Sequence, residues 1–361
     1  MLAAVSPAAA AEPLLPDLTQ ATPYQLGVIT DGTRSHLGFA SVVHNYGDGP
    51  LHVEGARPNA RQNFMVATQI IDMTEGPHTR VERVGRMRFV DAVTHRHWHY
   101  QRFSTYSLRR PDGRVAVPDR KSGFCLGDRL ESPNLGPLPN RAEFGEYGDS
   151  NCGYDRPDLL RVREGISVGY GDDYAPQVEG QYLDLTRVPA GRYVLVHHAN
   201  ADRAIREKSL ANNASSVLID LRWRGRTPRV TIVERCRGSS VCPVVPRLSD
   251  GRARSLARAA LRRAYRGRAI GSITCTGGSC STTVDGRAAT VAVRYRSARG
   301  RLYWTWSARG EALPARRGKV SVSLGAKRRV PVERGGFPPR GQAVKAAARA
   351  GYCQLPVSGS G

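Results

Sequence analysis

Short apolar runs separated by turn residues fill the first two thirds of the chain. Residues 42–55 place two such runs around an Asn-Tyr-Gly-Asp turn, and residues 87–108 alternate apolar and polar positions over a long stretch. Two more apolar segments flank the Pro-Ala-Gly at 189–191, a hairpin signal, and further strands follow at 216–225 and 228–236. Many short strands joined by turns predict a mainly β protein, and we expect a β-sandwich with long irregular loops over residues 14–235.

The pattern changes near Cys236. Ser249 can cap a helix that runs through about Arg266 and ends at Gly267. Arginine recurs at every fourth position of this helix, opposite a side made of leucine and alanine: Arg254, Arg258, Arg262 and Arg266 against Leu256, Ala260 and Ala264. Strand-like runs follow at 269–275, 288–296, 301–306 and 319–324. Residues 236–361 are therefore expected to form a small α+β domain.

Charge divides the chain at the same place. The 361 residues carry a net charge of +23, and the section from Cys236 onward holds 25 Lys and Arg against four Asp and Glu, a net +21. Such a section binds polyanions by counterion release, and DNA, acidic cell-wall polymers and anionic lipids all qualify. Its few aromatic residues argue against sequence-specific recognition of nucleic acid. A solvated, arginine-rich domain without a partner explains the composition equally well.

The first residues and the cysteines bear on the cellular compartment. Residues 1–13 are Ala-rich and apolar with a small-residue Ala8-Ala9-Ala10 end, which indicates a signal-peptide remnant; a disordered tail is the alternative. No later stretch is apolar over the roughly 20 residues that a membrane span requires. Cys236/Cys242 and Cys275/Cys280 are close pairs without zinc-ribbon spacing, so short-loop disulfides in a secreted, extracellular protein are expected. An odd count of seven leaves one thiol over, which we assign to Cys353.

Three histidines alternate in His95-Arg96-His97-Trp98-His99. On a strand, His95, His97 and His99 project from one face and can converge on a metal ion if the strand bends. Imidazole suits copper, zinc, nickel and iron, and three such ligands leave positions open for water or oxygen. The alternative is a solvated strand face. A long Pro-, Gly-, Asn- and Asp-rich region follows at 109–165, where function or disorder is usual.

These histidines resemble the copper motif of the lysyl oxidase family. Lys121-Ser122-Gly123-Phe124-Cys125-Leu126 is similar to the segment around that family's cofactor lysine. Gly180-Gln181-Tyr182-Leu183-Asp184-Leu185-Thr186 resembles its Cys-Gln-Trp-Ile-Asp-Ile-Thr, which places Tyr174 on the cofactor tyrosine. Asn212-Asn213 matches a paired Asn near the end of the domain. The resemblance covers roughly residues 14–225 and is to a bacterial-type member with an extra basic C-terminal domain.

The resemblance implies a copper-dependent amine oxidase of the protein-lysine 6-oxidase type. His95, His97 and His99 would bind Cu2+, and Lys121 and Tyr174 would form the cofactor lysine tyrosylquinone. Such an enzyme converts primary amines, peptidyl lysine among them, to aldehydes with O2 and releases ammonia and hydrogen peroxide. Asp172 is the candidate general base, although Asp172 and Asp173 also suit a turn or a calcium site.

The sequence departs from the family at several positions. Thr94, Tyr170 and Gly180 stand where the family has cysteines, whereas Cys125 and Cys152 remain and are expected to pair with each other. Two other functions stay open. One is a non-catalytic extracellular protein that binds metal, a polyanion or the cell wall. The other is a mononuclear zinc hydrolase that uses the same three histidines, against which the lack of an acid/base Glu in the motif speaks mildly. The natural amine and the oligomeric state are not encoded in these motifs.

Overall fold

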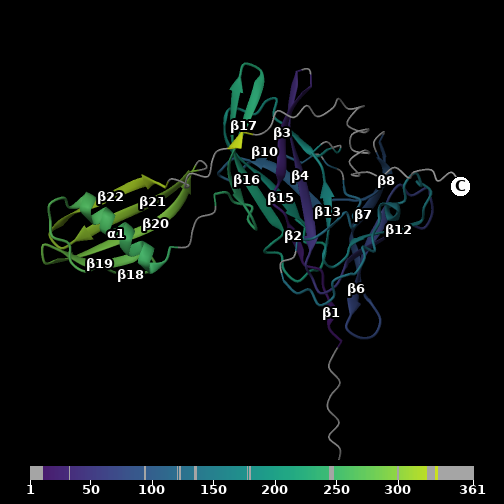
Figure 1. Ribbon diagram of the computed structural model, residues 1–361, viewed down its shortest axis with the longest axis horizontal. Coiled ribbons are helices and arrows are strands. Elements are labelled where there is room, and N and C mark those ends of the chain that lie inside the picture. Colours follow the sequence, from purple (N-terminus) through teal and green to yellow (C-terminus); the bar gives the residue numbers. More distant parts are fainter. Residues whose placement is uncertain are drawn as a thin grey trace, which may run out of the picture.

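The computed structural model describes residues 11–31, 33–92, 95–119, 121, 123–133, 136–176, 178, 180–243, 248–298, 301–322 and 330–331. It describes the backbone alone for Asp31, Ala92, His95, Asp149, Ser150, Ser297, Val330 and Pro331. Every strand pairing within these ranges is antiparallel, and the single α-helix belongs to the basic section (Figure 1). The expected mainly β fold is therefore confirmed. In the larger unit the strands form three sheets around one core, rather than the two layers of a simple sandwich.

The first sheet carries the histidine strand at its edge. Its order is β12-β5-β6-β7-β8, with β1 added on β6. The strands are β1 (Pro13–Leu14), β5 (Leu51–Ala56), β6 (Met65–Met73), β7 (Thr79–Ala92), β8 (His95–Tyr100) and β12 (Arg161–Ile166). Since β8 pairs only with β7 in this sheet, its other side is open to the irregular segments that follow it in sequence.

The second sheet is organised around the long strand β4, and the third around β15 and β16. The second has the order β11-β13-β4-β14, with β2 and β3 also on β4: β2 (Leu18–Gln20), β3 (Tyr24–Asp31), β4 (Arg34–Asn45), β11 (Leu130–Glu131), β13 (Tyr170–Tyr174) and β14 (Tyr182–Asp184). The third has the order β10-β9-β15-β16-β17-β23: β9 (Ser104–Arg109), β10 (Val115–Val117), β15 (Gly191–Ala199), β16 (Ala214–Arg224), β17 (Thr227–Cys236) and β23 (Val330–Pro331). A 3-10 turn, η1 (Asp149–Cys152), lies in the irregular region.

The three sheets bury one shared apolar core. Phe39 of β4, Trp98 of β8, Tyr106 of β9 and Leu195 of β15 are all buried in it. The Phe39 and Tyr106 rings meet edge to face at 5.1 Å. Burial of each aromatic side chain of this size contributes on the order of several kcal/mol to stability. The core therefore fixes the positions of the three sheets relative to one another, and so the positions of the polar residues at the strand ends.

The Asn212-Asn213 pair has a structural role. The Asn212 amide donates to Asp17 Oδ1 and to Thr19 Oγ1, both at 2.8 Å. Asn213 donates to the Glu207 carboxylate. These bonds tie the first strands of the chain to the start of β16, which explains why a paired Asn stands there.

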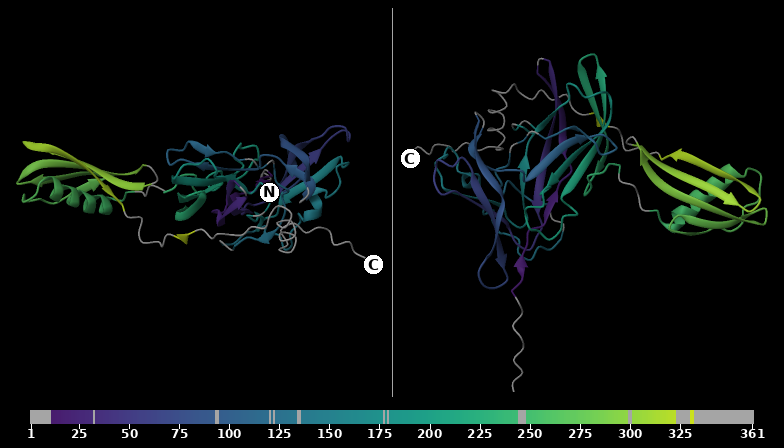
Figure 2. Two further views of the ribbon diagram at one scale, coloured as in Figure 1. Left: turned by 90° about the horizontal axis from the view of Figure 1, so that it is seen from above. Right: turned by 180° about the vertical axis from the view of Figure 1, so that it is seen from behind.

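The basic section folds as a separate small unit. One helix, α1 (Asp250–Ala264), covers one face of a five-stranded sheet (Figure 2): β18 (Thr274–Thr276), β19 (Ser279–Val284), β20 (Arg287–Ala298), β21 (Arg301–Gly310) and β22 (Leu313–Ser321). Its core is a cluster of its own. Ser249 is the N-cap and accepts from Arg252 N at 3.3 Å, as predicted, while the helix ends at Ala264, two residues before the expected Arg266.

Disulfides mark where the larger unit ends. Cys236 is the last residue of β17, and its bond to Cys242 packs against Val194, Val196 and Leu218 of the larger unit. Residues 236–242 therefore belong with the β-rich unit, beyond the boundary expected at 235. Cys275–Cys280 bridges β18 and β19, as the spacing predicted, and Cys353 lies outside the described residues. In the part of the chain that the structure describes, no helix is both long and apolar enough to cross a membrane.

Candidate active site

Two histidines of the alternating run meet in the interior. His97 and His99 are 3% and 4% exposed, and their Nε2 atoms lie 2.8 Å apart. They share one face of β8, as strand alternation predicted. The His97 ring also lies 4.4 Å from that of Tyr154, so the irregular region folds back over the histidine strand. The side chain of His95 lies outside the described residues.

The two imidazoles fit a shared metal ion. Nitrogens that approach within 2.8 Å can bind one ion between them, and neutral imidazole suits copper, zinc, nickel and iron. Among the described side chains, no group of three or more His, Cys, Asp or Glu is placed to hold a metal. The fit therefore rests on His97 and His99, with the third predicted ligand, His95, not described.

Lys121 and Tyr174 lie together, although they are far apart in sequence. The Lys121 Nζ atom is 3.7 Å from the centroid of the Tyr174 ring and 4.7 Å from that of Phe124. The Tyr174 hydroxyl donates to the Cys125 carbonyl oxygen at 2.9 Å, and Phe124 packs edge-on against the ring at 5.1 Å. The phenol is thus fixed at its oxygen and along one side, while the amine lies against its face.

Backbone pairing joins this pair to the histidine strand. Tyr100, the last residue of β8, forms a two-bond bridge with Phe124, at 2.8 and 3.0 Å. Gly123 lies so close to β8 that a Cβ there would come within 2.9 Å of His99 Cβ. Tyr174 itself ends β13 opposite Ser41 of β4. The metal-binding candidates and the cofactor candidates therefore occupy one region of the fold.

Asp172 lies two residues before Tyr174 on β13, and only 1% of it is exposed. Burial raises the pKa of its carboxyl from 3.8 to about 7, against the opposing charges of Arg129 and Lys121, and the neighbouring Asp173 raises it further. Its Oδ1 lies 3.4 Å from Arg129 Nε. Because β13 is a strand, Asp172 and Tyr174 project from the same face, and the turn alternative does not apply. A carboxyl with this pKa can both accept and release a proton near neutral pH.

Several polar residues of the site carried no signal by themselves in the sequence. Gln181 is fully buried, and its Oε1 accepts from the Tyr106 hydroxyl at 3.0 Å and from Lys121 Nζ at 3.5 Å. His197 is 1% exposed and packs on Tyr106 at 5.0 Å, and neither of its ring nitrogens has a hydrogen-bond partner among the described residues. Gln181 lies in the 180–186 motif, which is a weak signal for a functional role. His197 lies in an ordinary apolar strand pattern, which gives no such signal.

A disulfide closes the loop beside the reactive pair. Cys125–Cys152 is present, as the resemblance implied, and links residues 27 apart in sequence. Since Cys125 also accepts the Tyr174 hydroxyl, the bridge holds the carbonyl that orients the ring. Tyr170, which stands where the family has another cysteine, instead donates its hydroxyl to the Glu143 carbonyl.

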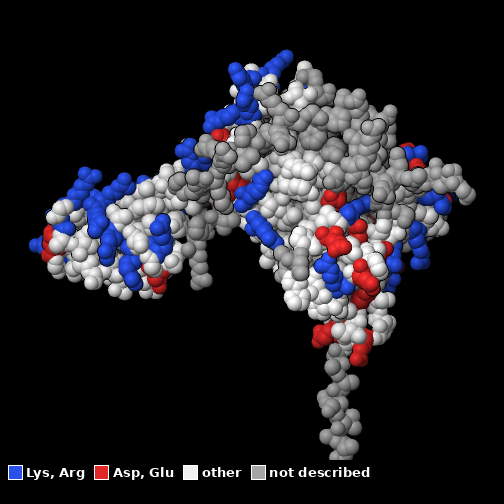
Figure 3. Space-filling model, viewed as in Figure 1, with Lys and Arg blue, Asp and Glu red and all other residues white. Residues whose placement is uncertain are grey.

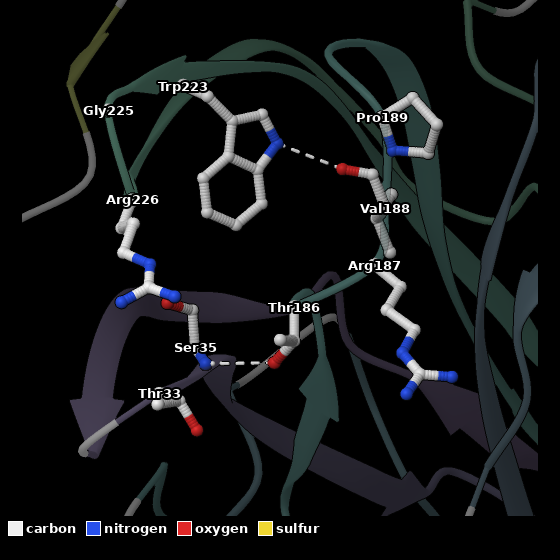
Figure 4. Close-up of a pocket in the computed structure, with 9 residues that line it drawn as sticks. All are labelled: Thr33, Ser35, Thr186, Arg187, Val188, Pro189, Trp223, Gly225 and Arg226. Carbon is white, nitrogen blue, oxygen red and sulfur yellow. Dashed lines mark hydrogen bonds between the residues drawn. The ribbon is translucent and has the colours of Figure 1, made fainter.

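A cavity of about 570 Å3 lies elsewhere in the larger unit, beside the β16–β17 hairpin (Figure 4). Trp223 stands over it and donates to the Val188 carbonyl at 2.9 Å. Its lining consists of Thr33, Ser35, Thr186, Arg187, Val188, Pro189, Trp223, Gly225 and Arg226. It contains no acid, imidazole or thiol, and none of the candidate residues above lines it. Acid–base chemistry is therefore better placed at Asp172 and the Lys121–Tyr174 pair, and metal binding at His97 and His99.

Comparison with known proteins identifies a family that this part of the chain resembles. The family model for lysyl oxidase matches residues 61–236. Lysyl oxidase homolog 2 of Gallus gallus is 26% identical over 186 residues, which cover 51% of this chain and 18% of that protein. Lysyl oxidase homolog 3 of Homo sapiens is 28% identical over 184 residues, again 51% of this chain and 18% of that protein.

A buried pair of imidazoles in the same region as a lysine that lies against a tyrosine ring defines a candidate active site on a β scaffold. By sequence, residues 61–236 match the lysyl oxidase family and are similar to these relatives. The chain spans less than a fifth of the length of these curated relatives. The match ends at Cys236, so the small basic unit lies outside it.

Proposed function

We propose that this protein oxidatively deaminates primary amines, including peptidyl lysine. One amine, one O2 and one water give one aldehyde, one ammonia and one hydrogen peroxide. In this proposal His95, His97 and His99 hold Cu2+, and Lys121 and Tyr174 form lysine tyrosylquinone. The observation that carries it is the approach of Lys121 Nζ to 3.7 Å from the Tyr174 ring centroid, beside two converging imidazoles.

The surrounding residues prepare Lys121 and Tyr174 for a covalent link. The Cys125 carbonyl and the edge of Phe124 hold the Tyr174 ring, which prevents it from turning away from the amine. Lys121 and Tyr174 are both partly exposed, so O2 and a small amine can reach them. Holding two reacting groups in contact removes much of the entropic part of the barrier.

Copper, when bound, supplies a redox centre at which O2 reacts, and lysine tyrosylquinone supplies the electrophilic carbonyl for the substrate amine. The protein's own groups do the rest. Asp172 is the proton acceptor for the carbon next to the amine, because its buried carboxylate projects on the same face of β13 as Tyr174 and has a pKa of about 7. Arg129, 3.4 Å from Asp172, keeps that carboxylate oriented.

The test is mass spectrometry of protein expressed with copper in air. Tryptic peptides that contain Lys121 and Tyr174 are expected as one covalent species, with one oxygen atom gained and four hydrogen atoms lost. Hydrogen peroxide release from a primary amine is expected to accompany it. Lys121→Arg and Tyr174→Phe each remove one partner and are expected to abolish both signals, while Lys208→Arg, an exposed lysine paired with Asp48, leaves both unchanged.

The alternatives predict other outcomes of the same experiment. If the two peptides run separately in copper-loaded protein, the quinone chemistry is wrong. Metal bound at His97 and His99 without a cross-link would then favour a non-catalytic metal-binding protein. A hydrolase would show turnover with zinc and no consumption of O2.

We further infer that the protein acts outside the cell. Disulfides form and persist in oxidising compartments, and Cys125–Cys152, Cys236–Cys242 and Cys275–Cys280 are all closed.

The small unit is proposed to hold a polyanion, such as an acidic cell-wall polymer. Lys and Arg side chains project at many places on its visible surface, where Asp and Glu are few (Figure 3). The sheet face that α1 leaves open carries a cross-strand row in which Arg294 and Lys319 flank Thr305. Arg296, Arg309 and Arg317 are exposed as well. Several positive charges on one face give polyanion binding that weakens with salt, whatever the sequence of the polymer.

A further inference from the structure

We propose that Gln181 is a positioning residue for Lys121: its buried carbonyl oxygen holds the lysine amine over the Tyr174 ring while leaving it free to lose a proton. This inference rests on the proposed function, since it concerns how Lys121 and Tyr174 become linked. No role for Gln181 follows from the family motif in which it stands.

The Gln181 amide is fixed from both ends, independently of the lysine. Its Oε1 accepts from the Tyr106 hydroxyl at 3.0 Å, and its Nε2 donates to Ser41 Oγ at 3.0 Å. All three residues are at most 1% exposed. A buried amide with both ends bonded has one orientation, so the oxygen that Lys121 Nζ approaches at 3.5 Å is held in place before the lysine arrives.

Strand β4 sets the distance between Gln181 and the ring. Ser41 of β4, the partner of the Gln181 amide, lies opposite Tyr174 in the β13–β4 register. Gln181 itself directly precedes β14, which pairs with the same strand. Gly180 has φ +78, and a Cβ built there would touch the Lys121 stem at 3.5 Å. The positions of the Gln181 amide and the Tyr174 ring are therefore both set by pairing with β4, and Gly180 brings the Lys121 side chain close to them.

The chemistry explains why an amide is suited to this position. Lys121 must lose its proton, which can leave to water from a partly exposed side chain, before its lone pair forms the C–N bond to the ring. Overall, one tyrosine and one lysine consume two O2. Two ring C–H bonds are replaced, one by a C–O bond and one by the C–N bond, and the products are the cross-link, one water and one hydrogen peroxide. A carbonyl oxygen binds both the ammonium and the amine, whereas a carboxylate would stabilise the ammonium and slow the step near neutral pH.

Other titratable groups near Lys121 also affect the protonation of its amine. The Asp119 carboxylate accepts from the Lys121 backbone N–H at 2.8 Å. Asp172 and Lys121 lie close enough that the lysine charge lowers the pKa of the acid. Burial lowers the pKa of His197 to about 3, and Lys121 lowers it further, so that imidazole adds no positive charge beside the amine. Tyr106 and Tyr174 lie in the same described cluster, and burial raises the pKa of Tyr106 well above 10.

The decisive variant is Gln181→Glu, which keeps the shape and adds a carboxylate 3.5 Å from the amine. In metal-free protein, competitive acetylation measured against pH is expected to show the pKa of the Lys121 amine raised by about one unit or more. In copper-loaded protein, the rate of cross-link formation at pH 7 is expected to fall about tenfold and to recover at higher pH. Gln181→Leu is expected to slow the cross-link at every pH, since it removes the holding contact without adding charge.

Gln69→Glu is the matched control. Gln69 is also fully buried: its Nε2 donates to the Arg206 carbonyl and its Oε1 accepts from the Arg206 N–H. It takes no part in the hydrogen bonds described between Gln181 and Lys121. It is expected to change stability without shifting the Lys121 labelling curve. An unshifted Lys121 curve in folded Gln181→Glu protein overturns the positioning role. An unlinked wild-type protein with the expected labelling shift would instead refute the proposed quinone chemistry and leave the Gln181 contact standing.

Discussion

At the scale of single residues, the site uses burial to set proton affinities. Asp172 is nearly inaccessible, and its pKa of about 7 arises because desolvation outweighs the nearby charges of Arg129 and Lys121. Glu164, also fully buried, has its pKa raised well above 4.5 for the same reason. Groups tuned in this way cost stability, which proteins accept at functional sites more often than elsewhere.

Asp172→Asn is expected to lose amine oxidation and gain stability at alkaline pH. The wild-type carboxyl holds its proton to about pH 7 when folded but loses it near pH 4 when unfolded. Over that interval the folded state binds more protons, so the free energy of unfolding falls as pH rises and stays low above pH 7. Three pKa units correspond to about 4 kcal/mol. Thermal melts of both proteins from pH 4 to 9 would check this, with equal stability expected at pH 4.

The activity of the wild-type protein should also depend on the protonation of Asp172, but it should rise with pH where stability falls. A protonated carboxyl cannot accept a proton, so kcat is expected to rise with pH and level off above about pH 7. Steady-state O2 consumption at saturating amine measures this limb. A kcat that is flat between pH 5 and 8 would remove Asp172 from the role of base.

At the scale of elements, the site depends on close contact between an irregular segment and an edge strand. Gly123→Ala would bring a Cβ within 2.9 Å of both His99 Cβ and the Tyr100 carbonyl. Such overpacking costs about 1–3 kcal/mol, and we expect it to displace His99 and weaken copper binding, as titration calorimetry can measure. Gly251→Ala in α1, with open space around the site, is the control and should be neutral or slightly stabilising.

The Cys125–Cys152 bridge holds the same segment. Replacing both cysteines by alanine is expected to lower stability by about 3 kcal/mol, because the bridge closes a loop of 27 residues. The yield of the Lys121–Tyr174 cross-link should fall too, since Cys125 orients the phenol. Removing Cys275–Cys280 in the small unit tests specificity: it should cost about 2 kcal/mol there and leave the cross-link yield unchanged.

The sequence predicted the features that depend on neighbouring residues and missed those that depend on contacts between distant segments. Strand alternation predicted that His97 and His99 share a face, and cap chemistry predicted the start of α1 at Ser249, because both are local. The meeting of Lys121 with Tyr174 was expected only through family resemblance. Gln181 contacts Lys121, and His197 lies close enough for the lysine charge to lower its pKa, because β14 and β15 pack against segments distant in sequence. No spacing rule encodes such proximity.

At the scale of the whole molecule, the chain joins a nearly neutral β-rich unit to a basic one. Oxidation chemistry is proposed in the first and attachment in the second. A net charge of +21 from Cys236 onward repels lysine-rich polymers, so the basic unit is not suited to gather cationic substrates. In the proposed division of roles, the basic unit would hold the protein on an acidic polymer while the larger unit acts on amines nearby.

Removing two charges from the open sheet face tests this division. Arg294→Ala with Lys319→Ala is expected to reduce the slope of log K against log salt by about 2 for double-stranded DNA, used as a regular polyanion, because each side chain releases about one counterion. Arg187→Ala with Arg226→Ala removes the same charge from the larger unit and should leave the slope nearly unchanged. Equal reductions in both variants would mean that the protein binds polyanions through its overall charge, and that the small unit has no special part in attachment.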